Sequence, residues 1–461
     1  MLDKKVADEV IHLALESGAD FCDIFVERTL GQTTVIASSD VESVNGGIDF
    51  GIGVRVIYGD KALYGYTNST DRDELLKVTA TLCAPDKRSQ QHQFKELNFL
   101  KPTNLHPCNS GLETDISLED KIAFLMQIDK AARGTSEKIA QAMVRLLQKK
   151  QDVEIFNSHG LHTSDSRHYT RVAAHMVATD GTEQADAFRG PGAMNGWDFT
   201  KSINPTEFGE MVASKALTSL TADHCPAGKM PVIIDNGFGG VIFHEACGHL
   251  LETTSVQTKS SVFWDKLGEQ IAHSAVNAVD DGTMPNAWGS INIDDEGMPT
   301  QRTQLIKDGK LTSFMVDYLG EIKTGHKRTG SARRQNYKFA PASRMRNTFI
   351  EAGDYKVEEL IASVDKGIYA KSMGGGSVKP GTGEFNFAVT EGYLIENGKI
   401  GKAVKGATLI GTGPDVLTKI SMVGNNFEID AGMCGSVSGS IPASVGQAAL
   451  KVDEILVGGK A

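Results

Sequence analysis

The sequence has few of the features that mark secreted or membrane-spanning proteins. Its 461 residues include only six cysteines, which are widely spaced and form no CxxC pair, so a disulfide framework is not expected. No apolar run is long enough to cross a bilayer. The N-terminal segment lacks the continuous apolar stretch of a signal peptide. We therefore expect a cytoplasmic protein with reduced thiols and no membrane contact.

Positive charge is also scarce. The chain has 47 Lys and Arg residues against 58 Asp and Glu residues, which gives a formal net charge of −11. Proteins that bind a phosphate backbone do so with clustered Lys and Arg side chains, and the sequence contains no run of them. Direct binding to nucleic acid is therefore not expected.

The length of the chain predicts two or three domains, because a single compact core rarely grows to this size. Helical and strand-like patterns both occur in each part of the chain, and the strands are joined by hairpin turns. We predict an α+β protein with antiparallel sheets in its N-terminal modules. The predicted divisions are an N-terminal α+β module (1–86), a linker (87–112), a central α+β module (113–226) and a large sheet-rich C-terminal domain (227–461).

Local signals support this organisation. Asp3 and Gly18 bracket an amphipathic N-terminal helix as its cap and its stop. A hairpin is expected where alternating apolar residues turn at Gly59 and Asp60. In the C-terminal domain, tight hairpin turns are expected at Asp308-Gly309 and Asn397-Gly398, because Asp-Gly and Asn-Gly are the strongest two-residue turn signals.

The segment from Val232 to Glu252, "VIIDNGFGGVIFHEACGHLLE", carries the chemistry that most needs an explanation. It reads as a short apolar strand, a glycine turn and an apolar helix that contains His244, Glu245 and His249. Burying unpaired polar groups is costly, and a metal ion bound by the histidines would remove that cost. Two satisfied core histidines are the alternative explanation.

The spacing of the two histidines is unusual for a metal site on a helix. Residues five apart point in directions about 140° apart around a regular α-helix. A π-bulge would bring the two rings together. Alternatively, the helix ends near Cys247-Gly248 and His249 swings back toward His244. Both geometries are compatible with the sequence.

Many further motifs resemble the TldD/PmbA family of zinc-dependent peptidases, also called modulators of DNA gyrase. The resemblance extends over nearly the whole chain and is densest after Val232. The motifs include "GADFCDIFVER", "GIGVRVIYGD", "HEACGH", "VDDGTMPNAWGSINIDDEGMPTQRTQLIKDGKL", "TGSARR", "SRMRNTFIEAG", "GYLIENGKIGKAVKGATLIGTGP" and "ISMVGN". The HExxxH motif is similar to that of the catalytic, TldD-like branch.

The resemblance implies a metallopeptidase that hydrolyses peptides or unfolded protein segments. By analogy, His244, His249 and Cys434 would bind Zn²⁺, and Glu245 would remove a proton from a water molecule bound to the metal. Glu252 is a second candidate for an oxygen ligand. Cys247 lies inside the motif and is expected to pack in the helix.

The segment after Cys434 departs from the family pattern. The family cysteine is usually followed by a Gly-Lys-x-Gly-Gln sequence, whereas this chain has Ser436, Ser438 and Gly439 at the positions of lysine, glycine and glutamine. This change keeps open an alternative function, a non-catalytic regulatory or binding subunit that modulates a partner protein related to gyrase or to a toxin–antitoxin system. The resemblance also implies a dimer, either a homodimer or a heterodimer with a PmbA-like paralogue.

Two groups of charged residues outside the motif are secondary candidates. Arg333, Arg334 and Arg344, with Arg346, form the best cationic cluster and could bind a peptide carboxylate or an oxyanion; structural ion pairs are an equal alternative. The acidic runs Asp280-Asp281 and Asp294-Asp295-Glu296 fit no known cation-binding loop and are expected to be solvated turns.

Overall fold

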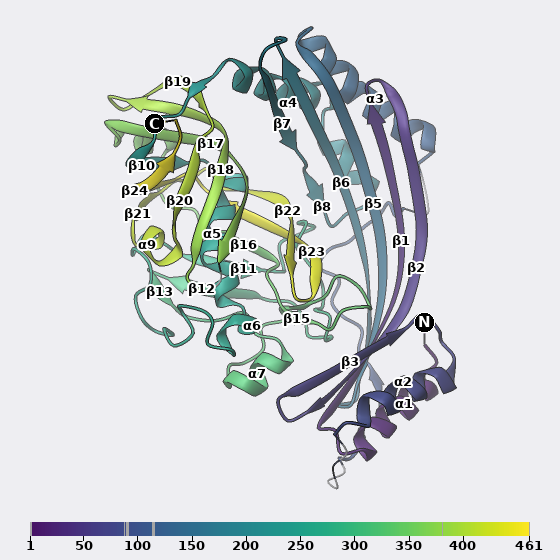
Figure 1. The fold of residues 1–461 in the computed structure, drawn as a ribbon. Coiled ribbons are helices and arrows are strands. Elements are labelled where there is room, and N and C mark those ends of the chain that lie inside the picture. Colours follow the sequence, from purple (N-terminus) through teal and green to yellow (C-terminus); the bar gives the residue numbers. More distant parts are fainter. Residues whose placement is uncertain (1, 87, 89–91, 113–115, 380, 461) are drawn as a thin grey trace.

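A computed structural model of the chain describes residues 2–86, 88, 92–112, 116–379 and 381–460. It is an α+β protein with several antiparallel sheets, as the sequence predicts (Figure 1). A long curved sheet stands on one side, and the sheet-rich C-terminal domain lies against its concave side. In the described part of the chain, no helix has the length and apolarity needed to cross a membrane.

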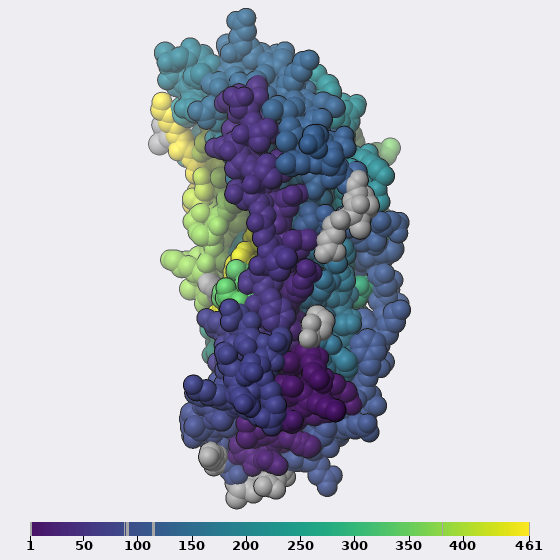
Figure 2. Space-filling model, turned by 90° about the vertical axis from the view of Figure 1, so that its right-hand side faces the viewer, coloured from purple at the N-terminus to yellow at the C-terminus, as the bar shows by residue number. Residues whose placement is uncertain are grey.

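The N-terminal half is built on one sheet of eight strands in the order β3-β2-β1-β5-β6-β4, with β7 and β8 also paired to β6. Its strands are β1 (Phe21–Ala37), β2 (Asp40–Tyr58), β3 (Lys61–Thr67), β4 (Asn98–Phe99), β5 (Ile139–Asn157), β6 (Leu161–Thr179), β7 (Gln184–Arg189) and β8 (Gly192–Ala193). The segments predicted as separate N-terminal and central modules share this sheet, because β1 pairs with β5 along most of its length. In Figure 2 the N-terminal segment, in purple, runs nearly the full length of the molecule.

Helices cover this sheet at its two ends (Figure 1). They are α1 (Lys4–Glu16) and α2 (Arg72–Cys83) at one end, and α3 (Leu118–Thr135) and α4 (Pro205–Thr221) at the other, preceded by the 3₁₀-helix η1 (Trp197–Ser202). The predicted N-terminal helix is confirmed: the Asp3 carboxylate accepts a hydrogen bond of 2.9 Å from the Lys5 amide. Gly18 follows the helix with φ +88°. Each helix pair has its own apolar core against the sheet.

Among the described residues, the C-terminal domain contains two larger sheets and a two-stranded ribbon. The first has the order β17-β10-β24-β20-β18-β19-β9, with β21 on β24 and an additional β17–β18 pairing; the second has the order β13-β12-β11-β16-β23-β22. The strands of the first are β9 (Asp223–His224), β10 (Gly228–Ile234), β17 (Lys366–Lys379), β18 (Glu384–Glu396), β19 (Lys399–Lys405), β20 (Thr408–Thr412), β21 (Ile420–Val423) and β24 (Leu450–Gly458). Those of the second are β11 (Ala278–Asp281), β12 (Arg302–Lys307), β13 (Lys310–Leu311), β16 (Asn347–Ile350), β22 (Glu428–Ser436) and β23 (Gly439–Gln447), and the ribbon is β14 (Ala332–Arg333) with β15 (Ala342–Ser343).

Short helices connect these strands. They are η2 (Gly237–Gly240), α5 (Val241–Ala246), η3 (Gly248–Leu251), α6 (Thr253–Val256), α7 (Tyr318–Thr324), α8 (Val357–Ala362) and α9 (Gly413–Thr418). Both hairpin turns predicted in the C-terminal domain are confirmed, as is the one at Gly59 and Asp60 between β2 and β3. Asp308-Gly309 joins β12 to β13, and Asn397-Gly398 joins β18 to β19, with positive φ at all four residues.

Replacing Gly398 by Ala is expected to destabilise the protein by about 1–2 kcal/mol, the cost of a left-handed conformation for a residue with a Cβ atom. Gly398 has φ +71°, and an added Cβ would lie 3.1 Å from the Ala362 carbonyl oxygen. Gly47 in β2 is the matched control, since its φ is not positive and a Cβ there meets nothing within 4 Å. Urea denaturation should show a lower free energy of unfolding for Gly398→Ala and an unchanged or higher one for Gly47→Ala. Equal effects would contradict this account of the turn.

The acidic run Asp294–Glu296 is buried between the two halves of the molecule, so the prediction of a solvated turn is wrong. Arg167 of β6 donates to Asp295 at 2.7 Å, and Arg55 of β2 lies 2.8 Å from Glu296. Burial raises the pKa of Glu296 to about 8, although the Arg55 guanidinium opposes the shift. The carboxyl groups of Asp295 and Glu296 therefore join the C-terminal domain to the N-terminal sheet, and each pairs with a buried arginine of that sheet.

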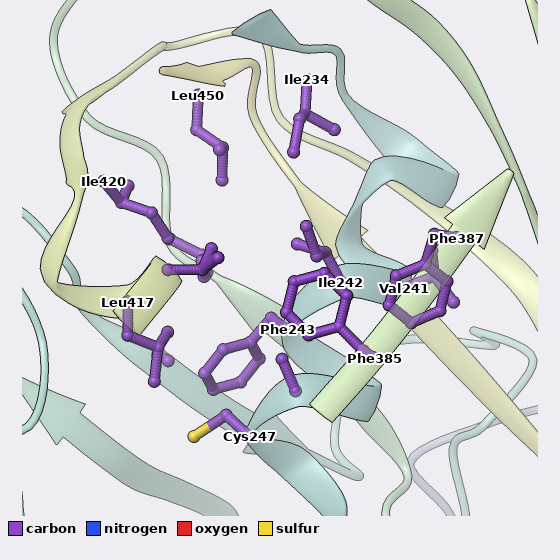
Figure 3. Close-up of a cluster of buried hydrophobic side chains, with 14 of the residues drawn as sticks. Ile234, Val241, Ile242, Phe243, Cys247, Phe385, Phe387, Leu417, Ile420 and Leu450 are labelled. Atoms are coloured by element: carbon purple, nitrogen blue, oxygen red, sulfur yellow. The ribbon is translucent and has the colours of Figure 1, made fainter. Parts of the chain in front are cut away.

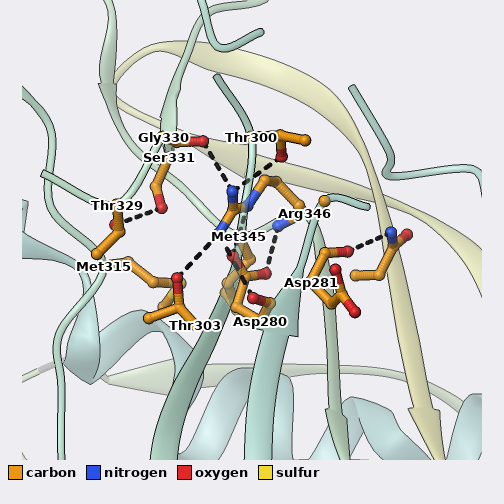
Figure 4. A network of polar contacts seen from close by, with 12 residues as sticks. Asp280, Asp281, Thr300, Thr303, Met315, Thr329, Gly330, Ser331, Met345 and Arg346 are labelled. Carbon is orange, nitrogen blue, oxygen red and sulfur yellow. Dashed lines mark hydrogen bonds and ion pairs between the residues drawn. The ribbon is translucent and has the colours of Figure 1, made fainter. Parts of the chain in front are cut away.

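Asp280 is also buried, against the same prediction (Figure 4). Its carboxylate accepts hydrogen bonds of 2.7 Å from both the amide and Nε of Arg346. Its Nη1 donates to the Gly330 carbonyl at 2.9 Å and to Thr300 Oγ1 at 3.0 Å, and its Nη2 donates to Thr303 Oγ1 at 3.3 Å. Each nitrogen of the Arg346 guanidinium thus donates to a protein group. Arg346 therefore fixes the start of β16 and is not free to bind a ligand.

Candidate metal centre

Helix α5 is anchored by its apolar face (Figure 3). Val241, Ile242 and Phe243 are buried in the largest apolar core, together with side chains from β10, β18, α9, β21 and β24. Cys247, at the end of the helix, is fully buried in the same cluster. His244, the residue after Phe243, faces Cys434 of β22, in the second sheet of the domain.

The helix ends between the two histidines, which is the second of the two geometries compatible with the sequence. Cys247 leaves helical geometry with φ −134° and ψ −48°, and the chain continues as the 3₁₀-helix η3 from Gly248. Gly248 packs so closely that an added Cβ would lie 2.3 Å from Met345 Sδ. The break therefore depends on a glycine at this position, and it turns His249 back toward His244.

Three side chains converge at this break. Nε2 of His244 lies 3.2 Å from Sγ of Cys434, and Nε2 of His249 lies 3.4 Å from the same sulfur. The candidate ligand atoms of the three residues all lie within 4.8 Å of one another. Cys434 lies near the end of strand β22.

The chemistry of these donors fits a zinc ion. Tetrahedral bonds of about 2.0–2.1 Å to nitrogen and 2.3 Å to sulfur separate such ligands by about 3.5 Å, close to the distances found here. Burial raises the pKa of Cys434, but His244 and His249 lower it more, to about 3, so the thiolate form is favoured. Thiolate and imidazole are the ligands that Zn²⁺ prefers. Burial alone raises the pKa of Cys247, so that residue stays an apolar thiol.

Glu245 is placed to act beside the three donors. Its Oε2 lies 3.7 Å from Nε2 of His249, on the side of the ring that faces Cys434. Its side chain is 24% exposed, whereas the His249 side chain is 12% exposed. The carboxylate is therefore reachable from solvent while the donors next to it are largely enclosed.

The three arginines predicted to bind substrate are buried and donate to protein groups. Arg344 donates to the Cys434 carbonyl at 2.6 Å, and Arg333 donates to the Pro442 carbonyl at 2.7 Å. Arg334 donates to the Asp295 carbonyl at 3.0 Å, and its guanidinium lies over the Phe25 ring. We therefore propose that they hold the β22–β23 hairpin and the domain contact.

Glu252, the second candidate ligand from the sequence, contacts the ring of His249 instead of facing Cys434. Its Oε2 lies 3.0 Å from Nδ1 of His249, on the opposite side of the ring from Nε2. This arrangement leaves Nε2 free to face Cys434. Glu252 is extended (φ −73°, ψ 134°) after the end of η3, so the i, i+3 spacing of a helix does not predict this contact.

Comparison with known proteins identifies the class of this fold and site. Three models of one metallopeptidase family match consecutive parts of the chain: the PmbA/TldA metallopeptidase domain 1 over residues 22–84, the central domain over 112–220 and the C-terminal domain over 227–459. The "Metalloprotease TldD homolog" of Haemophilus influenzae is 36% identical over 449 residues, which cover 95% of this chain and 93% of that protein. The chain belongs to the TldD/PmbA family.

More distant proteins are also similar to this chain over nearly its whole length. The "Zinc metalloprotease TldD homolog" of Saccharolobus solfataricus is 25% identical over 454 residues, which cover 97% of this chain and 99% of that protein. A crystal structure from Thermotoga maritima, described as a candidate modulator of a DNA gyrase, has a TM-score of 0.79 at 21% identity and covers 98% of this chain and 99% of its own. TldE from Thermococcus kodakarensis has a TM-score of 0.77 at 16% identity, covering 98% and 99%. These two structures share the fold.

Proposed function

We propose that this chain is a zinc-dependent peptidase that hydrolyses peptides or unfolded protein segments. The observation that carries the proposal is the convergence of His244, His249 and Cys434, with Glu245 beside them. His249 and Cys434 are far apart in the sequence, and their donor atoms approach to 3.4 Å. If the two histidines were only core residues, a buried thiolate and an accessible carboxylate would not be expected next to them.

In the proposed mechanism, His244, His249 and Cys434 hold the ion and Glu245 transfers protons. Zn²⁺, when bound, supplies a Lewis acid that polarises a carbonyl group and makes water more acidic. Glu245 takes a proton from the water whose oxygen attacks the peptide carbonyl carbon. The carbon–nitrogen bond then breaks, and Glu245 passes the proton to the leaving amine nitrogen, which yields a carboxylic acid and an amine.

The surroundings of Cys434 favour an extended substrate. Strand β22, which carries Cys434, is at the end of its sheet and pairs only with β23 among the described strands, although its Gly432 carbonyl already accepts a hydrogen bond of 2.7 Å from Trp288. A pocket of about 570 Å³ lies along this strand and is lined in part by Gly432 and Met433, the two residues before Cys434, although Cys434 itself does not line it. An extended segment can add to a sheet edge through main-chain hydrogen bonds, which suits unfolded chains of varied sequence.

The test is to measure metal content and peptide hydrolysis on the same purified protein. We expect close to one zinc ion per chain, loss of hydrolysis after treatment with a chelator, and recovery when Zn²⁺ is restored. An exposed, unstructured peptide should be cleaved and a stably folded protein should not. A protein that binds no metal and cleaves no peptide would instead support the alternative, a regulatory or binding subunit.

We also propose that the chain works as a dimer, with a second copy or with a PmbA-like paralogue, on the basis of its family. Light scattering at micromolar concentration should then give a mass near twice the 49.5 kDa of one chain, alone or after the paralogue is added. A mass of one chain under both conditions would contradict the proposal.

A further inference from the structure

We propose that Glu252 and Arg344 form a clamp that sets the position of His249 relative to Cys434, and that both are positioning residues for the metal. The inference rests on the zinc site proposed above. It concerns two residues that lie behind the donor atoms, on separate segments of the chain. Glu252 follows η3, and Arg344 lies between β15 and β16.

Glu252 fixes the ring of His249. One carboxylate oxygen, Oε2, lies 3.0 Å from Nδ1 of His249. This contact orients the ring so that its other nitrogen, Nε2, faces the sulfur of Cys434 at 3.4 Å. His244 has no such support, since its Nδ1 is buried without a hydrogen-bond partner among the described residues. Of the two histidines, His249 is therefore the one whose ring orientation is held by a hydrogen bond.

Arg344 fixes the other side of the site. Its Nη2 donates to the Cys434 carbonyl at 2.6 Å, and its Nη1 donates to Ser438 Oγ at 3.0 Å and to the Gly439 carbonyl at 2.9 Å. One planar guanidinium therefore spans the tip of the β22–β23 hairpin. Ser438 is one of the residues by which this chain departs from the family pattern, and it is fully buried here. The departure is accommodated by a contact with Arg344.

The two residues are joined to each other. Nε of Arg344 lies 3.7 Å from Oε1 of Glu252, and the same oxygen accepts a hydrogen bond of 3.3 Å from the Met345 amide. Both side chains are almost wholly buried, at 0% and 2% exposure. A buried ion pair is held mainly by its two charges, so removing one leaves the other uncompensated. A chain of contacts thus runs from His249 through Glu252 and Arg344 to Cys434.

The test uses Glu252→Gln and Arg344→Lys, with Glu154→Gln as the matched control. Glu154 is also a buried carboxylate that contacts a histidine, His162, at 2.9 Å, but it lies in the N-terminal sheet. Zinc affinity is measured by competition with a chromophoric chelator, and the geometry of the site is followed by the electronic spectrum of the Co²⁺-loaded protein. Each site variant should bind zinc between about tenfold and a hundredfold more weakly, the usual effect of residues that orient ligands. The spectrum should shift in both, and the control should match wild type in both measurements.

A double variant separates one clamp from two independent supports. If Glu252 and Arg344 act through each other, the loss of zinc affinity in the double variant should be clearly smaller than the product of the two single losses. Affinity within twofold of wild type and an unchanged Co²⁺ spectrum in both single variants would overturn the inference, as would losses that multiply. If Glu252→Gln does not fold, Arg344→Lys decides by the same affinity and spectrum. Failure of the wild-type protein to bind zinc would instead overturn the proposed function.

Discussion

Replacing Glu245 by Gln is expected to lower peptide hydrolysis by at least about a hundredfold, the usual contribution of a general base. The amide keeps the size of the side chain but cannot accept a proton. Zinc content should stay near that of wild type, because Glu245 is not among the three converging donors. Initial rates on an unstructured peptide, with metal analysis of the same sample, measure both quantities.

The control for this variant is Glu358→Gln, which makes the same chemical change on the exposed side of α8. Its rate and zinc content should match wild type. Hydrolysis at the wild-type rate in Glu245→Gln would remove Glu245 from the mechanism. A rate that falls only because zinc is lost would instead make Glu245 a residue that holds the metal.

Replacing Cys434 by Ala is expected to abolish detectable hydrolysis. Zinc binding should weaken by more than about a hundredfold, which is the largest usual loss for a residue that only orients a ligand. The sulfur lies 3.2 Å and 3.4 Å from the two histidine nitrogens and is the one donor that carries a full negative charge at neutral pH. Without it, only the two histidine rings of the three donors remain. Equilibrium dialysis against buffered zinc measures the loss.

Cys247→Ala is the matched control, because it removes the thiol that lies inside the HExxxH motif. Cys247 is fully buried in the core beneath α5, and burial raises its pKa. The variant should keep its zinc and its activity and lose about 1 kcal/mol of stability, a common cost for a small truncation. If Cys247→Ala lost zinc and Cys434→Ala kept it, the assignment of the thiol ligand would be wrong.

Local signals made much of this structure predictable. The caps of α1, the hairpins at Asp308-Gly309 and Asn397-Gly398, and the apolar helix that carries His244 all depend on residues close in the sequence. Their geometry follows from backbone preferences that a few neighbouring side chains determine. The same holds for the candidate ligands in the HExxxH motif, although Cys434 depended on family resemblance.

Features that depend on distant pairing were not predictable. The pairing of Asp23 with Asn157 merges the two N-terminal modules into one sheet, and nothing near either residue specifies its partner. The burial of Asp295 depends on Arg167, more than a hundred residues away. Likewise, the choice between a bulge and a helix end at Gly248 depends on the close approach of Met345. In each case the deciding atom belongs to another segment.

The measurement that tests the central claim most directly is X-ray absorption at the zinc K-edge of the zinc-loaded protein. The account predicts one sulfur at about 2.3 Å and two imidazole nitrogens at about 2.0–2.1 Å from the metal, with the sulfur missing in Cys434→Ala. A wild-type spectrum without sulfur in the coordination shell, or with the same sulfur contribution in Cys434→Ala, would contradict it.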